Sequence, residues 1–208
     1  MTRPRPRRSR TETREETRRR LLDAAAEEFT EHGFAGASLE AISARAGYTR
    51  GAFHWHFKSK EELLVAVLRE RLSTRIGATA EVVQRSSSAA AFNLAQRDQA
   101  AKVPFRKRRG WTLLMLEFWL HVARNPALLK EGRRLKSELR ESVESQTEQL
   151  LNSIGVTPPL PVDLIASALL ALEDGFALQE LLDPKGQPSS RLWDVLDFFA
   201  GAMLGRES

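Results

Sequence analysis

The sequence predicts an all-α protein: a three-helix, helix-turn-helix domain at the N-terminus, followed by a larger helical domain, with about nine helices in total. Apolar residues recur every three or four positions along most of the chain, as expected for helices with one buried face. Helix-capping signals cluster around a glycine at position 47. These observations divide the chain into a disordered basic arm (1–12), a helix-turn-helix domain (13–60) and a helical domain (61–208).

The positive charge of the chain is concentrated at one end. Residues 1–60 contain 13 Lys and Arg against 8 Asp and Glu, whereas residues 61–208 contain 19 of each, so the net charge of +5 belongs to the first 60 residues. Nine arginines lie among the first 20 residues. Such an arm suits an anionic polymer, either nucleic acid or a membrane surface, and a solubilising tail is the other interpretation. No amphipathic helix with a Trp- or Leu-rich face adjoins the arm, which weakens the membrane interpretation.

The composition also excludes some classes of protein. The chain has no cysteine, so disulfides, thiolate zinc sites and cysteine nucleophiles are excluded. No apolar run approaches the roughly 20 residues that a membrane span needs. No apolar stretch follows the basic start, as it would in a secretory signal. We therefore expect a cytoplasmic protein without a membrane partner.

Capping boxes predict where two of the helices begin. Thr13 and Glu16 have the spacing of such a box and predict the start of the first helix, which Gly33 would end. Ser59 and Glu62 predict the start of a long fourth helix. The buried face of the first helix is predicted to consist of Leu21, Leu22, Ala25 and Phe29.

Two short helices are predicted on either side of Gly47. Ser38 is a candidate N-cap for the first of them, and Gly47 suits the left-handed turn that ends it. Thr49 can cap the second helix, and Tyr48 and Phe53 occupy the positions of a hydrophobic staple. Two compact helices joined by a tight turn predict a helix-turn-helix.

The helix after the turn has two unlike sides. Projected at 100° per residue, its buried side consists of Phe53, His56 and Phe57. Its outward side consists of Arg50, Gly51, Ala52, His54 and Trp55. One long cation followed by two minimal side chains lets the backbone approach a partner closely, as a helix in the DNA major groove requires. A core segment explains the two phenylalanines but not the small and polar side.

A metal site at His54 and His56 is rejected on geometry. Side chains at positions i and i+2 diverge on a helix, whereas zinc-binding histidine pairs stand at i and i+4. No third ligand is near in the sequence, since His32 ends a different helix. No metal or other cofactor is expected.

These residues resemble a known family. The segment 21–64, with "AAEEFTEHGF", "SLEAISARAG" and "TRGAFHWHFKSKEELL" in order, resembles the DNA-binding domain of the tetracycline-repressor (TetR) family of transcriptional regulators. The resemblance implies helices over 38–46 and 49–57, the second lying in the major groove of double-stranded DNA. It implies a DNA-binding set of Ser38, Thr49, Arg50, Gly51, Ala52, His54, Trp55, His56 and Lys60.

Roles within this set follow from the resemblance and from chemistry. Arg50 is expected to contact a base. If it donates two hydrogen bonds to guanine, it would contribute about 1–3 kcal/mol of discrimination against other bases. Lys60 and His56 are expected at phosphates, and Trp55 at a thymine methyl group. Two residues depart from the family pattern: His54 stands where tyrosine is common and adds pH sensitivity, and Glu40 stands where a basic residue would favour DNA.

The larger domain reads as helices separated by proline breaks. "WTLLMLEFWLHVAR" (111–124) is apolar on most sides, and Asn125-Pro126 is predicted to start the next helix, which "TPPLP" (157–161) ends. Helices are predicted over 162–182 and 190–204, and residues 104–110 are predicted to form a basic loop after a possible helix in 86–103. Small residues in the last two helices indicate close packing, in a core or an interface. The resemblance implies the interface of a homodimer.

The resemblance also implies a pocket for a small-molecule effector among the middle helices. The candidate ligand-binding residues are Phe92, Phe105, Trp111, Leu114, Met115, Phe118, Trp119, His121, Leu172 and Phe176. Each has an ordinary core role as its alternative. Their aromatic and aliphatic character favours an apolar or aromatic ligand.

A ligand-responsive regulator, more specifically a repressor released from a pseudo-palindromic operator, is the function these features favour. An enzyme is not expected, because no nucleotide-binding, nucleophile-elbow or zinc-protease motif is present. No catalytic residues are therefore assigned. The alternative is an architectural DNA-binding protein with neither a dedicated operator nor an effector.

Overall fold

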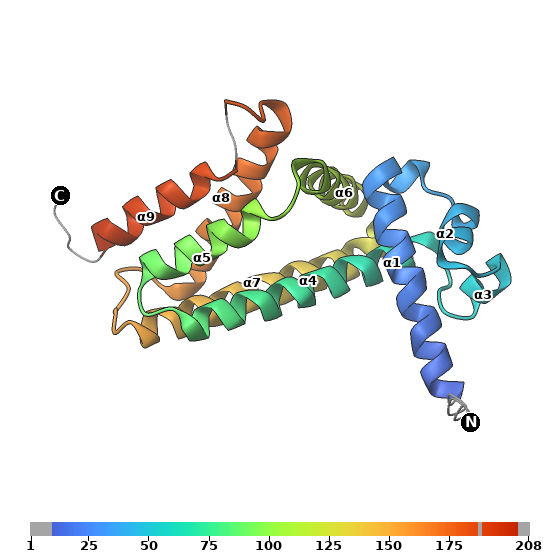
Figure 1. The fold of residues 1–208 in the computed structure, drawn as a ribbon, viewed down its shortest axis with the longest axis horizontal. Coiled ribbons are helices and arrows are strands. Elements are labelled where there is room, and N and C mark those ends of the chain that lie inside the picture. Colours follow the sequence, from blue (N-terminus) through green and yellow to red (C-terminus); the bar gives the residue numbers. More distant parts are fainter. Residues whose placement is uncertain (1–9, 187–188, 204–208) are drawn as a thin grey trace, which may run out of the picture. The chain divides into compact units, whose positions relative to one another are not determined.

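The predicted all-α fold is confirmed by the structure, a computed structural model that describes residues 10–186 and 189–203 (Figure 1). No strand occurs in these residues. The helices are α1 (Arg10–Gly36), α2 (Leu39–Ala46), α3 (Arg50–His54), α4 (Lys60–Arg85), α5 (Ala89–Ala101), α6 (Phe105–Arg124), the short 3₁₀ helix η1 (Pro126–Leu128), α7 (Leu129–Ser153), α8 (Val162–Leu182) and α9 (Arg191–Met203).

The chain forms two compact units, Met1–Glu70 and Arg71–Ser208. Their boundary falls inside α4, so this helix belongs to both units. The boundary predicted from the sequence lies earlier, at the start of the same helix. The N-terminal unit contains the helix-turn-helix, and the C-terminal unit contains the helices from α5 to α9.

Helix α1 begins earlier than the sequence analysis predicts. Residues 10–12, assigned there to a disordered arm, are helical, and Thr13 lies inside the helix instead of capping it. Charged residues at four-residue spacing support this first part, since Arg20 donates to Glu16 at 2.7 Å. The rest of the predicted arm, residues 1–9, lies outside the described residues.

The core of the N-terminal unit follows the predicted pattern. The buried side chains of α1 include Leu21, Leu22, Ala25 and Phe29, as expected. Gly33 interrupts α1 with a φ of 72°, a left-handed conformation that glycine adopts without a Cβ clash. The guanidinium of Arg45, near the end of α2, contacts the carboxylates of Glu27, Glu28 and Glu31 of α1 at 2.8–3.0 Å, which joins the two helices.

The turn between α2 and α3 is built by the predicted caps. The Ser38 hydroxyl accepts from the Ala41 N–H at 3.0 Å, and Gly47 ends α2 in the left-handed region with a φ of 77°. Thr49 caps α3 by accepting from the Ala52 N–H at 3.4 Å. These local bonds set the direction in which α3 leaves the turn.

The start of α4 departs in detail from a capping box. The Ser59 hydroxyl accepts from the Glu62 N–H at 3.1 Å, as predicted. The Glu62 carboxylate, however, accepts from the N–H of Lys58 at 2.8 Å, one residue before the cap. The extra bond also secures the segment that links α3 to α4.

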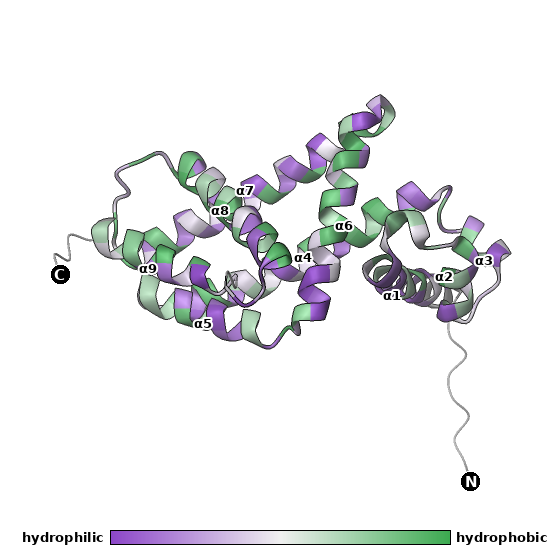
Figure 2. Ribbon diagram, turned by 90° about the horizontal axis from the view of Figure 1, so that it is seen from above, coloured by the Kyte–Doolittle hydropathy of each residue, from purple (hydrophilic) through white to green (hydrophobic). Residues whose placement is uncertain are grey.

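Polar side chains join the helices of the C-terminal unit. The Asn93 amide of α5 donates to Asp197 of α9 at 2.7 Å, and these helices lie side by side in Figures 1 and 2. The buried Glu180 carboxylate of α8 accepts from Arg108 of α6 at 2.7 Å and from Ser189 at 3.0 Å. A buried charge is stable here because it is both paired and hydrogen-bonded.

The prediction of a basic loop over residues 104–110 is wrong. Only Pro104 precedes the helix, and Phe105–Gly110 form the first turns of α6. Arg108 explains the difference, because it ties this segment to Glu180 and to the Val103 carbonyl oxygen. The predicted helices over 86–103 and 162–182 are confirmed as α5 and α8, and the last predicted helix as α9.

The close approach of α6 and α7 at Gly132 gives a stability prediction. A Cβ at Gly132 would lie 2.4 Å from Cγ1 of Val122, a stiff β-branched side chain. Gly132→Ala should lower the free energy of unfolding by about 1–3 kcal/mol, as overpacking does. In a matched control, Gly77→Ala in α4 meets no atom within 4 Å and should raise it by about 0.5–1 kcal/mol. Urea denaturation measures both, and an equal effect of the two substitutions would contradict the packing argument.

Candidate functional site

Helix α3 buries one face and presents the other to solvent. Phe53 is fully buried and Phe57 is 2% exposed, whereas Trp55 is 84% exposed. Gly51 and His54 are also exposed, and Ala52 is half-buried. The predicted buried side is confirmed for Phe53 and Phe57, and the predicted outward side for Gly51, His54 and Trp55. His56, predicted on the buried side, and Ala52, predicted on the outward side, are both half-buried.

Helix α3 is shorter than the 49–57 segment that the family resemblance implies. It ends at His54, and the chain then makes a tight turn in which the His56 N–H donates to the Phe53 carbonyl oxygen at 2.9 Å. This tightening lets Phe57 return to the core while Trp55 stays outside. A helical projection of the sequence cannot show where the helix ends, because it assumes that the helix continues.

Arg50, at the first position of α3, has a partner on α2. Its Nη1 donates to Oε1 of Glu40 at 2.5 Å, and both side chains are more than half exposed. In the sequence, Glu40 is notable only as an acidic residue where a basic one would favour DNA, and nothing there indicates this pair. The three-residue turn between the helices brings the two residues together, although they lie ten positions apart in the sequence.

His56 lies beside the basic face of α1. Burial, with the positive charges of Arg14 and Arg18, lowers the pKa of His56 below its ordinary value. The Arg18 guanidinium also lies over the Phe57 ring, 5.3 Å from its centroid. Arginines of the first helix are therefore neighbours of the residues that follow α3.

The remaining predicted DNA-contacting side chains already have local bonds. Ser38 and Thr49 are both exposed and act as helix caps. The Lys60 ammonium donates to the Ala37 carbonyl oxygen at 2.9 Å and lies 4.6 Å from the Phe34 ring centroid. An ammonium has three donors, so the bond to Ala37 leaves donors for a phosphate.

The ten predicted ligand-binding residues occupy different environments in the C-terminal unit. Leu114 and Phe118 are fully buried side chains of the core. The other eight are half-buried, namely Phe92, Phe105, Trp111, Met115, Trp119, His121, Leu172 and Phe176. Their assignment to one ligand site stays a prediction.

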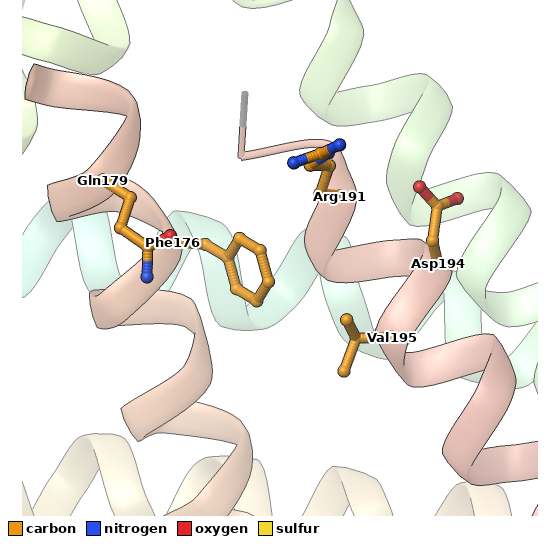
Figure 3. Close-up of a pocket in the computed structure, with 5 residues that line it drawn as sticks. All are labelled: Phe176, Gln179, Arg191, Asp194 and Val195. Carbon is orange, nitrogen blue, oxygen red and sulfur yellow. The ribbon is translucent and has the colours of Figure 1, made fainter. Parts of the chain in front are cut away.

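A pocket of about 330 Å³ lies between α8 and α9 (Figure 3). The residues that line it are Phe176, Gln179, Arg191, Asp194 and Val195. Of these, Phe176 alone was predicted from the sequence as a ligand-binding residue. Asp194 is paired with Arg97 of α5. The sequence gives no signal for the four other residues, because the spacing within two separate helices does not indicate which of their faces meet.

The part of α4 within the C-terminal unit carries two arginines that contact other helices. Arg71 lies over the Trp111 ring of α6, 4.5 Å from its centroid. Arg75 donates to the Glu173 carboxylate of α8, and this charge raises the pKa of Arg75. Burial, together with the Glu173 charge, raises the pKa of Asp174. This stretch of α4 thus contacts α6 through Trp111 and α8 through Glu173.

Within residues 10–186 and 189–203, each helix is too short or too polar to span a lipid bilayer. The same residues contain no group of three or more His, Cys, Asp or Glu side chains placed to hold a metal ion.

Comparison with known families agrees with this geometry. Residues 21–67 match the family of "Bacterial regulatory proteins, tetR family". Residues 100–205, about half of the chain, match "BetI-type transcriptional repressor, C-terminal". The chain belongs to the TetR family, and it is a DNA-binding transcriptional regulator and not an enzyme.

Individual relatives resemble the chain to different extents. The regulator SrpR of Pseudomonas putida is 53% identical over 57 residues, 27% of each chain, so the match covers about a quarter of that relative. The repressor AcnR of Corynebacterium glutamicum is 25% identical over 92% of this chain and 94% of its own.

Two solved structures show the same fold. A transcriptional regulator from Rhodococcus sp. Rha1 has a TM-score of 0.66 and 28% identity, over 90% of this chain and 95% of that one. A regulator from Saccharomonospora viridis, solved in complex with choline, has a TM-score of 0.69 and 20% identity, over 89% and 95%.

The environment of His56 gives a prediction about pH. In the free protein its pKa lies below the ordinary 6.5, whereas a nearby phosphate would raise it, so binding DNA takes up a proton. We expect DNA affinity to rise as the pH falls from about 8 to 6, by at most about tenfold per pH unit for one proton. Fluorescence anisotropy at constant ionic strength measures this, and His56→Gln should flatten the profile. An unchanged slope in His56→Gln would place the proton elsewhere, and His54→Gln would then test the second histidine.

The lowered pKa of His56 also makes the stability of the fold depend on pH. Because folded His56 resists protonation, its contribution to the free energy of unfolding is complete above the ordinary pKa of 6.5 and decreases as the pH falls toward the lowered folded-state value. Acid therefore weakens the fold through this residue, whereas it would strengthen the predicted phosphate contact. His56→Gln removes both effects.

Proposed function

We propose that this TetR-family regulator is a homodimeric repressor that leaves a pseudo-palindromic operator when an apolar or aromatic small molecule binds its C-terminal unit. The observation that carries the proposal is the exposed face of α3. Arg50, Gly51, His54 and Trp55 are held outward by caps and by a buried Phe53, and Trp55 is 84% exposed. An aromatic side chain so exposed contributes little to its own fold, which supports a role in contacting a partner.

Chemistry divides the reading residues into two groups. Arg50 supplies sequence discrimination, because a guanidinium can donate two parallel bonds to guanine O6 and N7. Lys60, His56 and the helix N-terminus capped by Ser38 supply phosphate contacts, which carry affinity without sequence information. Because Gly51 has no side chain and Ala52 only a methyl group, the backbone of α3 can approach the bases closely in the major groove.

The test of this function is the selection of bound fragments from randomised and genomic DNA at about 0.15 M salt, where specific and non-specific binding separate. We expect one inverted repeat to be enriched, and Arg50→Ala to abolish its enrichment while leaving the fold intact. Retention of DNA without a shared motif would contradict an operator-specific regulator and would favour an architectural binder.

A row of small and apolar residues on α8 supports the homodimer. They recur at alternating spacings of four and three: Leu164, Ala168, Ala171, Gly175, Leu178 and Leu182. Leu182 is 80% exposed and Phe198 of α9 is 71% exposed. Such a row is the seam along which two helices pack, and exposed apolar surface of this kind marks an interface.

Gly175 in this row gives a prediction about the dimer. A Cβ there meets no atom within 4 Å in a single chain, so Gly175→Leu should leave the protomer folded but obstruct a second copy packed on α8. We expect sedimentation equilibrium to show weaker dimerisation. Gly77→Leu makes the same change at a helical glycine that is also open, and it should leave the dimer unchanged. If both variants stay dimeric, the α8 row is not the interface.

The effector is proposed to act through α4. This helix runs from the N-terminal unit into the C-terminal one, where Arg71 contacts Trp111 and Arg75 contacts Glu173. A ligand that displaces Trp111 would shift α4 and alter the separation of the two recognition helices. To weaken DNA binding tenfold, the ligand must prefer the DNA-free state by about 1.4 kcal/mol. The choline complex of the Saccharomonospora viridis regulator supports a small-molecule site in this fold.

A further inference from the structure

The cation that begins the recognition helix is already engaged before DNA arrives. Arg50 and Glu40 are 62% and 59% exposed, and the atoms Nη1 and Oε1 lie 2.5 Å apart. A pair as exposed as this contributes little to folding stability. Glu40 lies in the first turn of α2, where a carboxylate favours the helix dipole, but that effect does not require Arg50.

Both ends of the pair are fixed by local structure. Glu40 follows the Ser38 cap by two residues, and Arg50 directly follows the Thr49 cap. The left-handed turn at Gly47 places the two helix starts so that one side chain reaches the other. The carboxylate thus restrains a long side chain that would otherwise sample many rotamers in water.

We propose that Glu40 is a specificity-determining residue that positions Arg50 for a base and weakens binding to DNA in general. The inference rests on the proposed role of Arg50 in reading a base. A guanidinium has five N–H donors in a planar fork. One of them is used by Glu40, and enough remain for a bidentate contact with guanine.

The Glu40 carboxylate favours binding to operator DNA and disfavours binding to other DNA. Where a guanine accepts both bonds, a restrained Arg50 loses less conformational freedom on binding. Where DNA offers phosphate alone, the Glu40 carboxylate offsets the positive charge of Arg50 and repels the phosphate. Glu40 therefore widens the difference between operator and other DNA. This accounts for an acidic residue on a face that otherwise suits an anion.

The experiment compares Glu40→Gln with the wild-type dimer on the selected operator and on an unrelated duplex of equal length. Affinities are measured over a range of salt concentrations. For the unrelated duplex we expect affinity to rise about three- to tenfold and the salt dependence to steepen by about 0.9 log units per log unit, as for one added phosphate contact. The ratio of operator affinity to unrelated affinity should fall by about tenfold or more.

A matched control separates positioning from net charge. Glu27→Gln removes one carboxylate from an exposed pair with an arginine, Arg45, at 3.0 Å, and Glu27 is 66% exposed. The pair joins α1 to α2 and does not involve α3. It should leave the affinity ratio near that of the wild type. Equal effects of Glu27→Gln and Glu40→Gln would overturn the proposal, since charge alone would then explain both.

A double-mutant cycle identifies the residue through which Glu40 acts. In the Arg50→Ala background, Glu40→Gln should no longer change the preference among bases at the position that Arg50 reads. A change that persists there would mean that Glu40 contacts DNA directly, which overturns the positioning role. Failure of the proposed function has a different signature: the wild type itself would enrich no operator, or Arg50→Ala would leave enrichment unchanged. Unchanged urea midpoints of Glu40→Gln and Glu27→Gln establish that the variants are folded.

Discussion

A helix of five residues cannot persist alone in water, because nucleating a single turn costs more than its few hydrogen bonds return. Helix α3 therefore depends on the burial of Phe53, which has no exposed surface, and on Phe57 immediately after it. The burial of these two rings fixes which side of α3 faces outward. The caps at Ser38 and Thr49 and the turn at Gly47 set the approach of the chain, but they do not replace this packing.

Arginines of the N-terminal unit serve two physical purposes. Arg45 contacts three glutamates of α1, and the hydrogen bonds that it donates to Glu31 and Glu27 raise its pKa. Its role is to join helices. Arg50 has one exposed partner, leaves several donors available and stands at the start of α3. The number and direction of the carboxylates around each guanidinium thus distinguish a structural cation from one available to a ligand.

The C-terminal unit has a buried carboxylate within its core and exposed apolar side chains on its surface. Glu180 is buried with Arg108 and Ser189 around it, whereas Leu182, two residues later on the same helix, is 80% exposed. In a helix, positions two apart point to different sides, so α8 contacts its own unit with one face and leaves an apolar row on another. Figure 2 shows the hydrophobic character of α8 and α9. Trp111 and Glu173 meanwhile contact the arginines of α4.

The sequence by itself determined the features that arise from neighbouring residues. These are the all-α class, the caps at Ser38 and Thr49, the left-handed Gly47 and the outward side of α3, because capping and helical periodicity act over only a few positions. Local signals also misled: Thr13 has capping chemistry but lies within α1, and the basic run after Pro104 is helical. Only the tertiary structure decided the partner of Arg50, the end of α3, the pocket beside Phe176 and the exposure of the α8 row. Each of these depends on which faces of separate helices meet, and that choice is made by packing across long sequence separations.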